Sequence, residues 1–252
     1  VGGRRVHLGQ QHPCARMGRG PVVTAPIQAV TAWPTNAELI ADVARLGHLT
    51  DRPTWDGTHG LGVWWRQWRP TVLHRTDLRP DKSPDAPDGL DATATGWPDG
   101  RWEQVALDPP YGLRGTDTGD AQLDRFGLAE SMTRDARHDL MARMLIEGAR
   151  LLAPGGTLLF RCQDQIEGSR LRLQSHAFAA LGEALGLEVV DLLGMLGGRP
   201  QPAGRAQHHA RRNVSQLIVF RRPRRPRVPA LRLTQLAPAA LTDVHRLTEV
   251  AS

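Results

Sequence analysis

The sequence predicts an α/β domain in which a doubly wound, mostly parallel sheet carries helices on both faces. Three observations support this. Short apolar segments that suit buried strands alternate with segments of helical periodicity along most of the chain, as in βαβ units. A glycine-rich turn at 57–62 follows the first predicted strand of the main pattern. A Pro-Gly-Gly turn at 154–156 lies between a helix and a strand.

Composition divides the 252-residue chain into three parts. Residues 1–26 mix glycine, arginine, glutamine and proline without a period, and we expect a disordered arm there. Residues 27–221 carry the strand and helix patterns and are long enough for one domain with a full core. We expect residues 222–252 to be a basic Pro/Arg linker and tail.

The first predicted helix begins after Thr35, which forms a capping-box pattern with Glu38. Apolar residues follow at helical spacing, and Gly47 can end the helix. The polar stretch 112–137 is long for a loop in a compact domain, which favours function or disorder. Further helices are predicted at 139–152 and 174–185, and strands at 53–55, 72–76, 105–107, 157–160, 187–193 and 214–220.

Asp108-Pro109-Pro110-Tyr111 follows the apolar residues 105–107, so it lies where a buried strand ends. Proline lacks an N–H group and fixes φ, and it restricts the preceding residue to extended geometry. The tetrad therefore forms a stiff platform that presents a carboxylate, an aromatic ring and carbonyl groups without sheet partners. These groups can accept hydrogen bonds from a ligand.

The tetrad resembles the (D/N)PP(Y/F/W) motif of S-adenosylmethionine-dependent amino-methyltransferases. The stretch Asp56-Gly57-Thr58-His59-Gly60-Leu61-Gly62 resembles the (D/E)xxxGxG first motif of class I methyltransferases, in which glycines let the backbone approach the ligand before a helix N-terminus. The resemblance covers about residues 33–221 and implies the class I Rossmann-like fold. That fold has seven strands, with the last pair antiparallel, and S-adenosyl-L-methionine as cofactor.

The resemblance also implies roles for single residues. Asp56 would bind the amino-acid end of the cofactor. Asp77, which ends the second predicted strand, would bind ribose hydroxyls. Asp91 would lie near the adenine, although Asp85 and Asp88 are of the same type. The cofactor-binding residues are then Asp56, Thr58, Gly60, Gly62, Asp77 and Asp91.

The catalytic residues implied are Asp108, Pro109, Pro110 and Tyr111. Asp108 and the Pro109 carbonyl would accept the two hydrogens of an exocyclic amine, and Tyr111 would stack on the base. The expected reaction is methylation of adenine N6 or cytosine N4 in DNA. An RNA base methyltransferase is the alternative, because no segment is long enough for a sizeable target-recognition region. A non-catalytic nucleic-acid-binding protein on the same fold is an alternative from another class. A protein-glutamine methyltransferase is disfavoured because that group has Asn at the first position.

The net charge of +6 and the pI of about 10.7 suit a nucleic-acid partner. Nine arginines and no acid lie between Arg199 and Arg227. A solvated basic face is the alternative, and Lys82 is the only lysine, so arginine bias also contributes. Residues 221–227 are interpreted as a basic tail. The predicted phosphate-binding residues are Arg199, Arg205, Arg211 and Arg212.

Other classes of protein are disfavoured. Cys14 and Cys162 have no metal-ligand spacing, so we expect no metal and a reducing, cytoplasmic location. No apolar run approaches the about 18 residues of a membrane span, so we expect no membrane partner. We expect Trp64, Trp65 and Trp68 to pack in the core instead of forming a base-stacking set.

Overall fold

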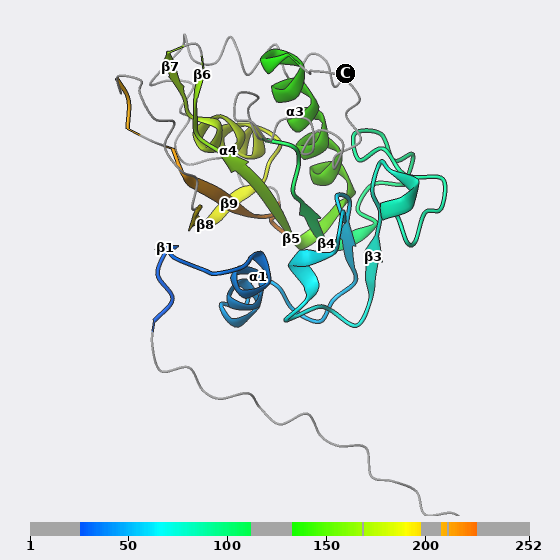
Figure 1. Ribbon diagram of the computed structural model, residues 1–252. Helices are drawn as coiled ribbons and strands as arrows, with labels where there is room; N and C mark the ends of the chain where they lie inside the picture. The colour runs from blue at the N-terminus through cyan, green and yellow to red at the C-terminus, as the bar shows by residue number, and fades with distance from the viewer. Residues whose placement is uncertain (1–25, 112–132, 168, 198–207, 211, 226–252) are drawn as a thin grey trace, which may run out of the picture.

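The structure is a computed structural model that describes residues 26–111, 133–167, 169–197, 208–210 and 212–225 (Figure 1). The predicted N-terminal arm, apart from residue 26, lies outside the described residues. So do 226–252 of the predicted tail and most of the polar stretch 112–137. The elements of the fold are those of the described part of the chain.

A seven-stranded sheet has the order β1-β8-β9-β5-β4-β2-β3. β2, β3, β4 and β5 are mutually parallel, and β9 pairs antiparallel with both β5 and β8. The expected mostly parallel Rossmann-like sheet, with its last two strands antiparallel, is confirmed. The strands are β1 (Val30–Thr31), β2 (Thr54–Asp56), β3 (Leu73–Arg75), β4 (Trp102–Leu107), β5 (Leu152–Gln163), β8 (Glu188–Leu196) and β9 (Val214–Arg221).

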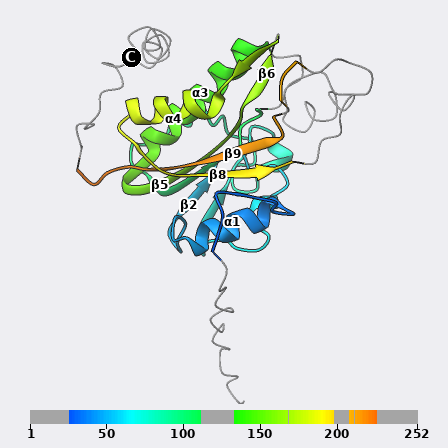
Figure 2. The ribbon, with the colours of Figure 1, turned by 90° about the vertical axis from the view of Figure 1, so that its left-hand side faces the viewer.

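Helices cover both faces of the sheet, as predicted (Figure 2). On one face α3 (Arg134–Leu151) and α4 (Gln174–Ala184) pack over Leu107 and Phe160. On the other face α1 (Asn36–Arg45) packs over Ala106 and Leu159. Neighbouring residues of β4 and β5 therefore point into two different cores, because side chains alternate along a strand.

The predicted capping box of α1 is present. The Thr35 hydroxyl accepts a hydrogen bond from the Glu38 N–H at 3.3 Å, and Glu38 Oε2 accepts one from the Thr35 N–H at 2.9 Å. Ile40 and Val43 are fully buried on the face that meets the sheet. Gly47 follows the helix with φ of +79°, the left-handed conformation that favours glycine.

Three predictions about local structure were wrong or incomplete. The two-residue strand β1 was not predicted, and it pairs with β8 at the sheet edge. The hairpin of β6 (Gln165–Glu167) and β7 (Arg170–Arg172) was also missed. The Pro-Gly-Gly segment lies within β5 as an irregularity, where the pairing with β4 jumps from Leu152 to Thr157. The first and the third depend on contacts between distant parts of the chain, whereas the hairpin pairs residues that are close in sequence.

The helix expected after the glycine-rich turn is replaced by one 3-10 turn, η1 (Val63–Trp65). Trp64 and Trp65 are each only 6% exposed, which confirms their predicted place in the core. A β-branched residue and two tryptophans are weak helix formers, and Pro70 lies a few residues further on. A second 3-10 turn, η2 (Pro80–Lys82), lies in the segment between β3 and β4.

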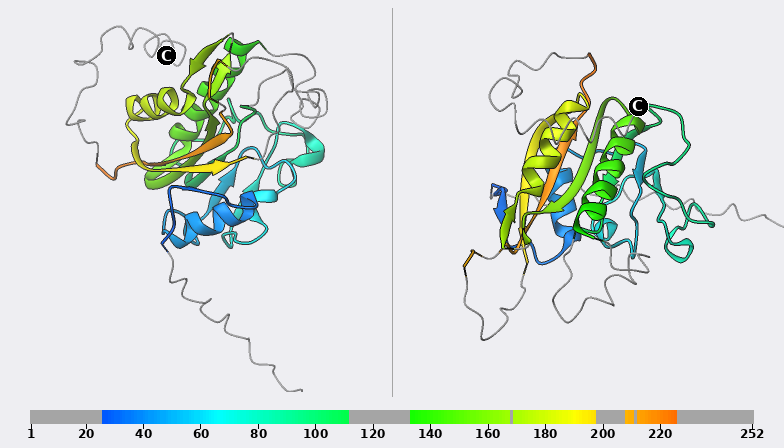
Figure 3. Two further views of the ribbon diagram at one scale, coloured as in Figure 1. Left: turned by 60° about the vertical axis from the view of Figure 1, so that its left-hand side comes forward. Right: turned by 90° about the horizontal axis from the view of Figure 1, so that it is seen from above.

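Figure 3 shows the same sheet from two further sides, with α3 and α4 lying along the strands they cover. Across the described residues, none of the helices combines the length and the apolar character that crossing a membrane requires.

The contact between α4 and β9 leaves no room for a side chain at Gly182. A Cβ there would lie 2.2 Å from the nearest ring atom of Phe220. We expect Gly182→Ala to lower the free energy of unfolding by about 1–3 kcal/mol, the usual cost of overpacking. Urea denaturation measures this. Adding Phe220→Leu should recover part of the loss, and strictly additive effects of the two substitutions would contradict the packing argument.

Candidate functional site

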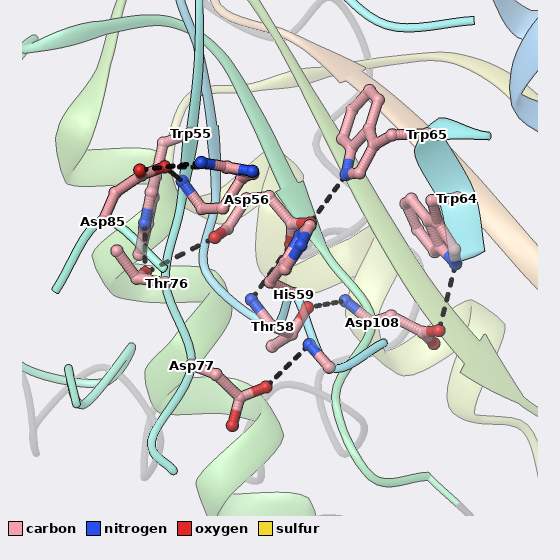
Figure 4. Close-up of polar contacts among 12 residues, drawn as sticks. Trp55, Asp56, Thr58, His59, Trp64, Trp65, Thr76, Asp77, Asp85 and Asp108 are labelled. Carbon is pink, nitrogen blue, oxygen red and sulfur yellow. Dashed lines mark hydrogen bonds and ion pairs between the residues drawn. The ribbon is translucent and has the colours of Figure 1, made fainter. Parts of the chain in front are cut away.

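The carboxyl ends of β2 and β4 lie side by side, because Asp56 pairs in register with Ala106. The glycine-rich turn leaves β2 there, and Asp108 follows β4 directly. The two segments identified in the sequence therefore meet at one edge of the sheet (Figure 4).

Asp56 is 5% exposed and its carboxylate is held by three groups. Trp65 Nε1 donates to Oδ2 at 2.6 Å, and His59 Nδ1 lies 2.9 Å from the same oxygen. The Thr58 N–H donates to Oδ1 at 3.1 Å. The carboxylate thus fixes the glycine-rich turn and η1 from inside (Figure 4). Asp56 does not line the cavity that lies beside this turn.

A narrow, mostly apolar cavity lies between the glycine-rich turn and the end of β4. It brings together six of the residues singled out in the sequence, and also Gly57, which was not among them. Leu78, Ala92, Leu140 and Met144 supply the apolar part. The predicted residues that line it are Thr58, Gly60, Asp77, Asp91, Asp108 and Pro110. Asp56, Gly62, Pro109 and Tyr111 do not line it.

Thr58 connects the two segments. Its hydroxyl accepts a hydrogen bond from the Asp108 N–H at 2.7 Å, while its own N–H binds Asp56. The turn after β2 and the first residue of the Asp-Pro-Pro-Tyr segment are therefore fixed relative to each other. Any ligand held by one is presented to the other in a defined position.

Asp77 and Gly60 form the side of the cavity next to β3. The Gly60 N–H donates to Asp77 Oδ2 at 2.9 Å, and the Arg79 N–H donates to Oδ1 at 3.0 Å. Burial nevertheless raises the pKa of Asp77, and these two hydrogen bonds oppose the rise. At Asp91, the third acid, Oδ1 accepts from the Thr93 N–H and hydroxyl, both at 2.8 Å.

The glycines of the turn differ in the space available for a side chain and in their backbone conformation. At Gly57 a Cβ would lie 2.5 Å from the Trp55 ring. Gly62 has φ of +63°, and a Cβ there would lie 2.9 Å from the His59 ring. Gly60 has φ of +55°, and a Cβ would meet nothing closer than 3.9 Å. Of these three positions, Gly60 is the one that lines the cavity and leaves open space.

The carboxylate of Asp108 points toward η1, where Trp64 Nε1 donates to its Oδ2 at 3.1 Å (Figure 4). Burial raises the pKa of Asp108. The Arg161 guanidinium lowers it, the nearby Asp56 carboxylate raises it, and the Trp64 hydrogen bond lowers it. Burial is the largest of these effects, so the neutral form is favoured more than in water.

Arg161 was not identified from the sequence. It follows Phe160, which pairs with Leu107, so Arg161 lies on β5 beside Asp108. It is 3% exposed, and its guanidinium donates to Asn36 Oδ1 at 2.7 Å and to Ser215 Oγ at 2.8 Å. No ion pair joins it to a carboxylate of the described residues. An arginine inside the apolar run of a buried strand was the signal that could have revealed it.

The remaining predicted residues are placed as follows. Pro109 is buried, and the ring of Tyr111 packs at the edge of the core under α3. The Gln165 side chain donates to the Tyr111 carbonyl, so the unpredicted β6–β7 hairpin holds the end of the tetrad.

Of the four predicted phosphate-binding residues, Arg199, Arg205 and Arg211 lie outside the described residues. Arg212 is exposed, and its carbonyl accepts a hydrogen bond from Gln163 Nε2 at 2.6 Å. The described ranges contain no group of three His, Cys, Asp or Glu side chains placed to hold a metal.

Comparison with known proteins gave matches among solved structures alone. No family model and no curated protein matches the chain. A candidate DNA modification methylase from Thermus thermophilus is 21% identical, with a TM-score of 0.36, over 62% of this chain and 61% of that protein. It is also known in complex with S-adenosyl-L-methionine. A candidate methyltransferase from Bacillus halodurans is 15% identical, with a TM-score of 0.48, over 73% and 98% of the two chains.

The raised pKa of Asp108 has a consequence for stability. Above the ordinary pKa of 3.8 the folded state binds more protons than the unfolded state, so this group lowers stability as pH rises. An asparagine side chain at this position does not ionise, and its carbonyl oxygen can still accept the hydrogen bond from Trp64 Nε1. We therefore expect Asp108→Asn to be more stable than the wild type at neutral pH, by a margin that shrinks toward pH 4.

Urea denaturation at pH 4, 6 and 8 measures this margin. Asp88→Asn, at an exposed position in the loop after η2, is the matched control and should change stability little. An Asp108→Asn protein that is no more stable than the wild type at any of these pH values would contradict the electrostatic account of Asp108.

Proposed function

We propose that this protein transfers a methyl group from S-adenosyl-L-methionine to an exocyclic amine of a nucleic-acid base. One observation carries the proposal. A single cavity joins the glycine-rich turn and Asp77 to Asp108, the first residue of the Asp-Pro-Pro-Tyr segment. The groups that suit a nucleoside cofactor and those that suit an amine acceptor are thus neighbours.

The residues of the cavity fit the proposed cofactor. Asp77 offers carboxylate oxygens to ribose hydroxyls, and Leu78 and Ala92 offer an apolar surface for adenine. Gly60 leaves open space beside the turn. When bound, S-adenosyl-L-methionine supplies an electrophilic methyl group on a sulfonium centre. Asp56 would contribute indirectly, because its carboxylate holds the turn and does not line the cavity.

Asp108 and its neighbours suit the acceptor. The lone pair of an exocyclic amine is delocalised into the base, so the amine must be held in a defined orientation before it can attack. Asp108 would accept one amino hydrogen and the Pro109 carbonyl the other, which also stabilises the positive charge that develops on nitrogen. Trp64 and Arg161 favour the charged carboxylate against its burial. The Tyr111 ring would stack on the base.

The favoured substrates are adenine N6 and cytosine N4 in DNA, with the Arg199–Arg212 segment as the expected phosphate contact. A duplex base would have to be flipped out of the stack, at a cost of a few kcal/mol. An RNA base is the second candidate, because the described residues build a sheet with its covering helices and one short hairpin. That leaves little described surface for reading a long DNA site.

Gly60→Leu should lower the affinity for S-adenosyl-L-methionine at least tenfold, because the new side chain would enter the open space beside the cavity. Gly47→Leu is the matched control. It too has a positive φ and open space at its Cβ, but it lies after α1 and away from the cavity. Both variants carry the same backbone strain, about 1–2 kcal/mol, and should unfold at similar temperatures.

Isothermal titration calorimetry with S-adenosyl-L-methionine tests this on proteins checked by thermal unfolding. Equal losses of affinity in the two variants would indicate a general effect of backbone strain. Undiminished affinity in a folded Gly60→Leu protein would remove the cofactor assignment from this cavity.

Asp108→Ala should lower methyl transfer at least 100-fold, a loss typical of removing one group that stabilises transition-state charge. The affinity for S-adenosyl-L-methionine should change little. The assay is transfer of tritiated methyl from the cofactor to separate DNA, RNA and protein pools, with Asp88→Ala as the control. Wild-type turnover in the Asp108→Ala protein would contradict the proposed mechanism. Label that enters the protein pool alone would contradict the nucleic-acid substrate.

A further inference from the structure

A second cavity, of about 600 Å³, lies at the edge of the sheet opposite to Asp108. It is formed where β4 begins, near Glu103 and Gln104, and where the antiparallel strand β9 ends, at Arg221. Thr157 of β5 pairs with Arg221 across its floor. The cavity therefore belongs to the amino ends of the parallel strands, and no step of the proposed reaction uses it.

The lining of this cavity is strongly basic. Two acids, Glu103 and Glu188, face five arginines, which gives a net formal charge of +3. His48 also lines it, but its ring binds Asp191 at 2.8 Å. The five arginines are Arg52, Arg221, Arg222, Arg224 and Arg225.

The arginines fall into two groups by their contacts. Arg52 lies 3.5 Å from Glu103, and the Arg222 guanidinium donates to the Leu152 carbonyl at 2.6 Å, just beyond α3. These two arginines have partners within the described part of the chain. Arg221, Arg224 and Arg225 are exposed and form no ion pair with the described residues. Three guanidinium groups without a carboxylate partner in the described chain thus gather at one cavity.

The backbone holds this arginine segment in place. The Arg222 N–H donates to the Gly156 carbonyl at 3.0 Å, and the Gly155 N–H donates to the Arg222 carbonyl at 2.7 Å. The stem of Arg224 lies against Gly155. The sequence suggested a basic tail from residue 221 on. Arg221 is instead the last residue of β9, and Arg222 and Arg224 are fixed to the segment that interrupts the β4–β5 pairing.

We propose that this amino-edge cavity, lined by Arg221, Arg224 and Arg225, binds the phosphodiester backbone of a nucleic acid. Guanidinium groups bind phosphate oxygens in bidentate geometry, and the cavity is far larger than one phosphate. The anion chemistry follows from the arginines. The choice of nucleic acid as the ligand rests on the proposed function.

Such a site would lie away from the reacting base. β4 has six residues and so spans about 20 Å at roughly 3.3 Å per residue. A nucleic acid long enough to pass from one edge of the sheet to the other would use both sites. An oligonucleotide of about five nucleotides can occupy one of the two sites, so it gains less from having both.

The test compares the full-length wild type with Arg221→Gln/Arg225→Gln. The matched control is Arg45→Gln/Arg143→Gln, which removes the same charge from exposed, ion-paired positions on α1 and α3. Fluorescence anisotropy would follow binding of labelled single-stranded and duplex DNA and RNA, at 30 and at five nucleotides, over 50–300 mM salt. Calorimetry with inorganic phosphate is the small-anion probe.

We expect Arg221→Gln/Arg225→Gln to bind the 30-nucleotide probes about tenfold more weakly. The slope of log affinity against log salt should become shallower by about 0.7 per lost contact for single strands and about 0.9 for duplexes. The control should keep the wild-type slope, and the five-nucleotide probes should lose less affinity than the 30-nucleotide probes, because they cannot use both sites at once. A wild-type slope in Arg221→Gln/Arg225→Gln would overturn the proposal. So would loss of phosphate binding alone, with oligonucleotide binding intact.

The two proposals fail in different ways. If the wild type transfers no methyl group to nucleic acid but the arginine substitutions still weaken oligonucleotide binding, the proposed function fails and the amino-edge site stands. If methyl transfer occurs and the salt slope is unaffected, the amino-edge site fails and the proposed function stands.

Discussion

The buried carboxylate of Asp56 is the constraint on which the site depends. It accepts hydrogen bonds from the Trp65 indole and the Thr58 N–H, and it contacts His59. With only one 3-10 turn after the glycines, the chain has no long helix to fix this turn. The Asp56 carboxylate fixes the turn instead. Thr58 then binds the Asp108 N–H, so one buried acid determines where both halves of the site lie.

Strand register explains the electrostatics of the site. Ala106 and Leu159 face α1, so the residues two positions further along β4 and β5, Asp108 and Arg161, belong to the same face. The Arg161 guanidinium lowers the pKa of Asp108 there without an ion pair between them, and burial of Asp108 outweighs it. Arg161 in turn is held by Asn36, at the start of α1. The helix that covers this face therefore also supports the charge next to Asp108.

Local signals in the sequence predicted the fold well. The Thr35 capping box, the alternation of strands and helices and the position of Asp108 at a strand end depend on residues close together in the chain. The cavity likewise contains Gly60 and Asp77, which the motif spacing indicated. Long-range contacts were not predictable in the same way. Nothing near residue 30 indicates that it pairs with Gly194 to form β1.

The role of Asp56 shows the same limit for the site. Its place before the glycines predicts a contact with a ligand. In the structure Trp65 and His59 contact its carboxylate instead, and the spacing of the motif does not indicate these contacts. Arg161 was missed because its effect on Asp108 crosses two strands that are far apart in sequence. The arginines after β9 are similar. Composition predicts a tail, but backbone hydrogen bonds with Gly155 and Gly156 make Arg222 part of the domain.

The central claim is that an exocyclic amine, held by Asp108 and its neighbours, receives the methyl group. Mass spectrometry of nucleosides from DNA and RNA treated with the protein and S-adenosyl-L-methionine tests it most directly. We predict N6-methyladenine or N4-methylcytosine, as the deoxynucleoside if DNA is the substrate. A methyl group found only on a ring carbon, a ring nitrogen or a ribose oxygen would contradict the claim.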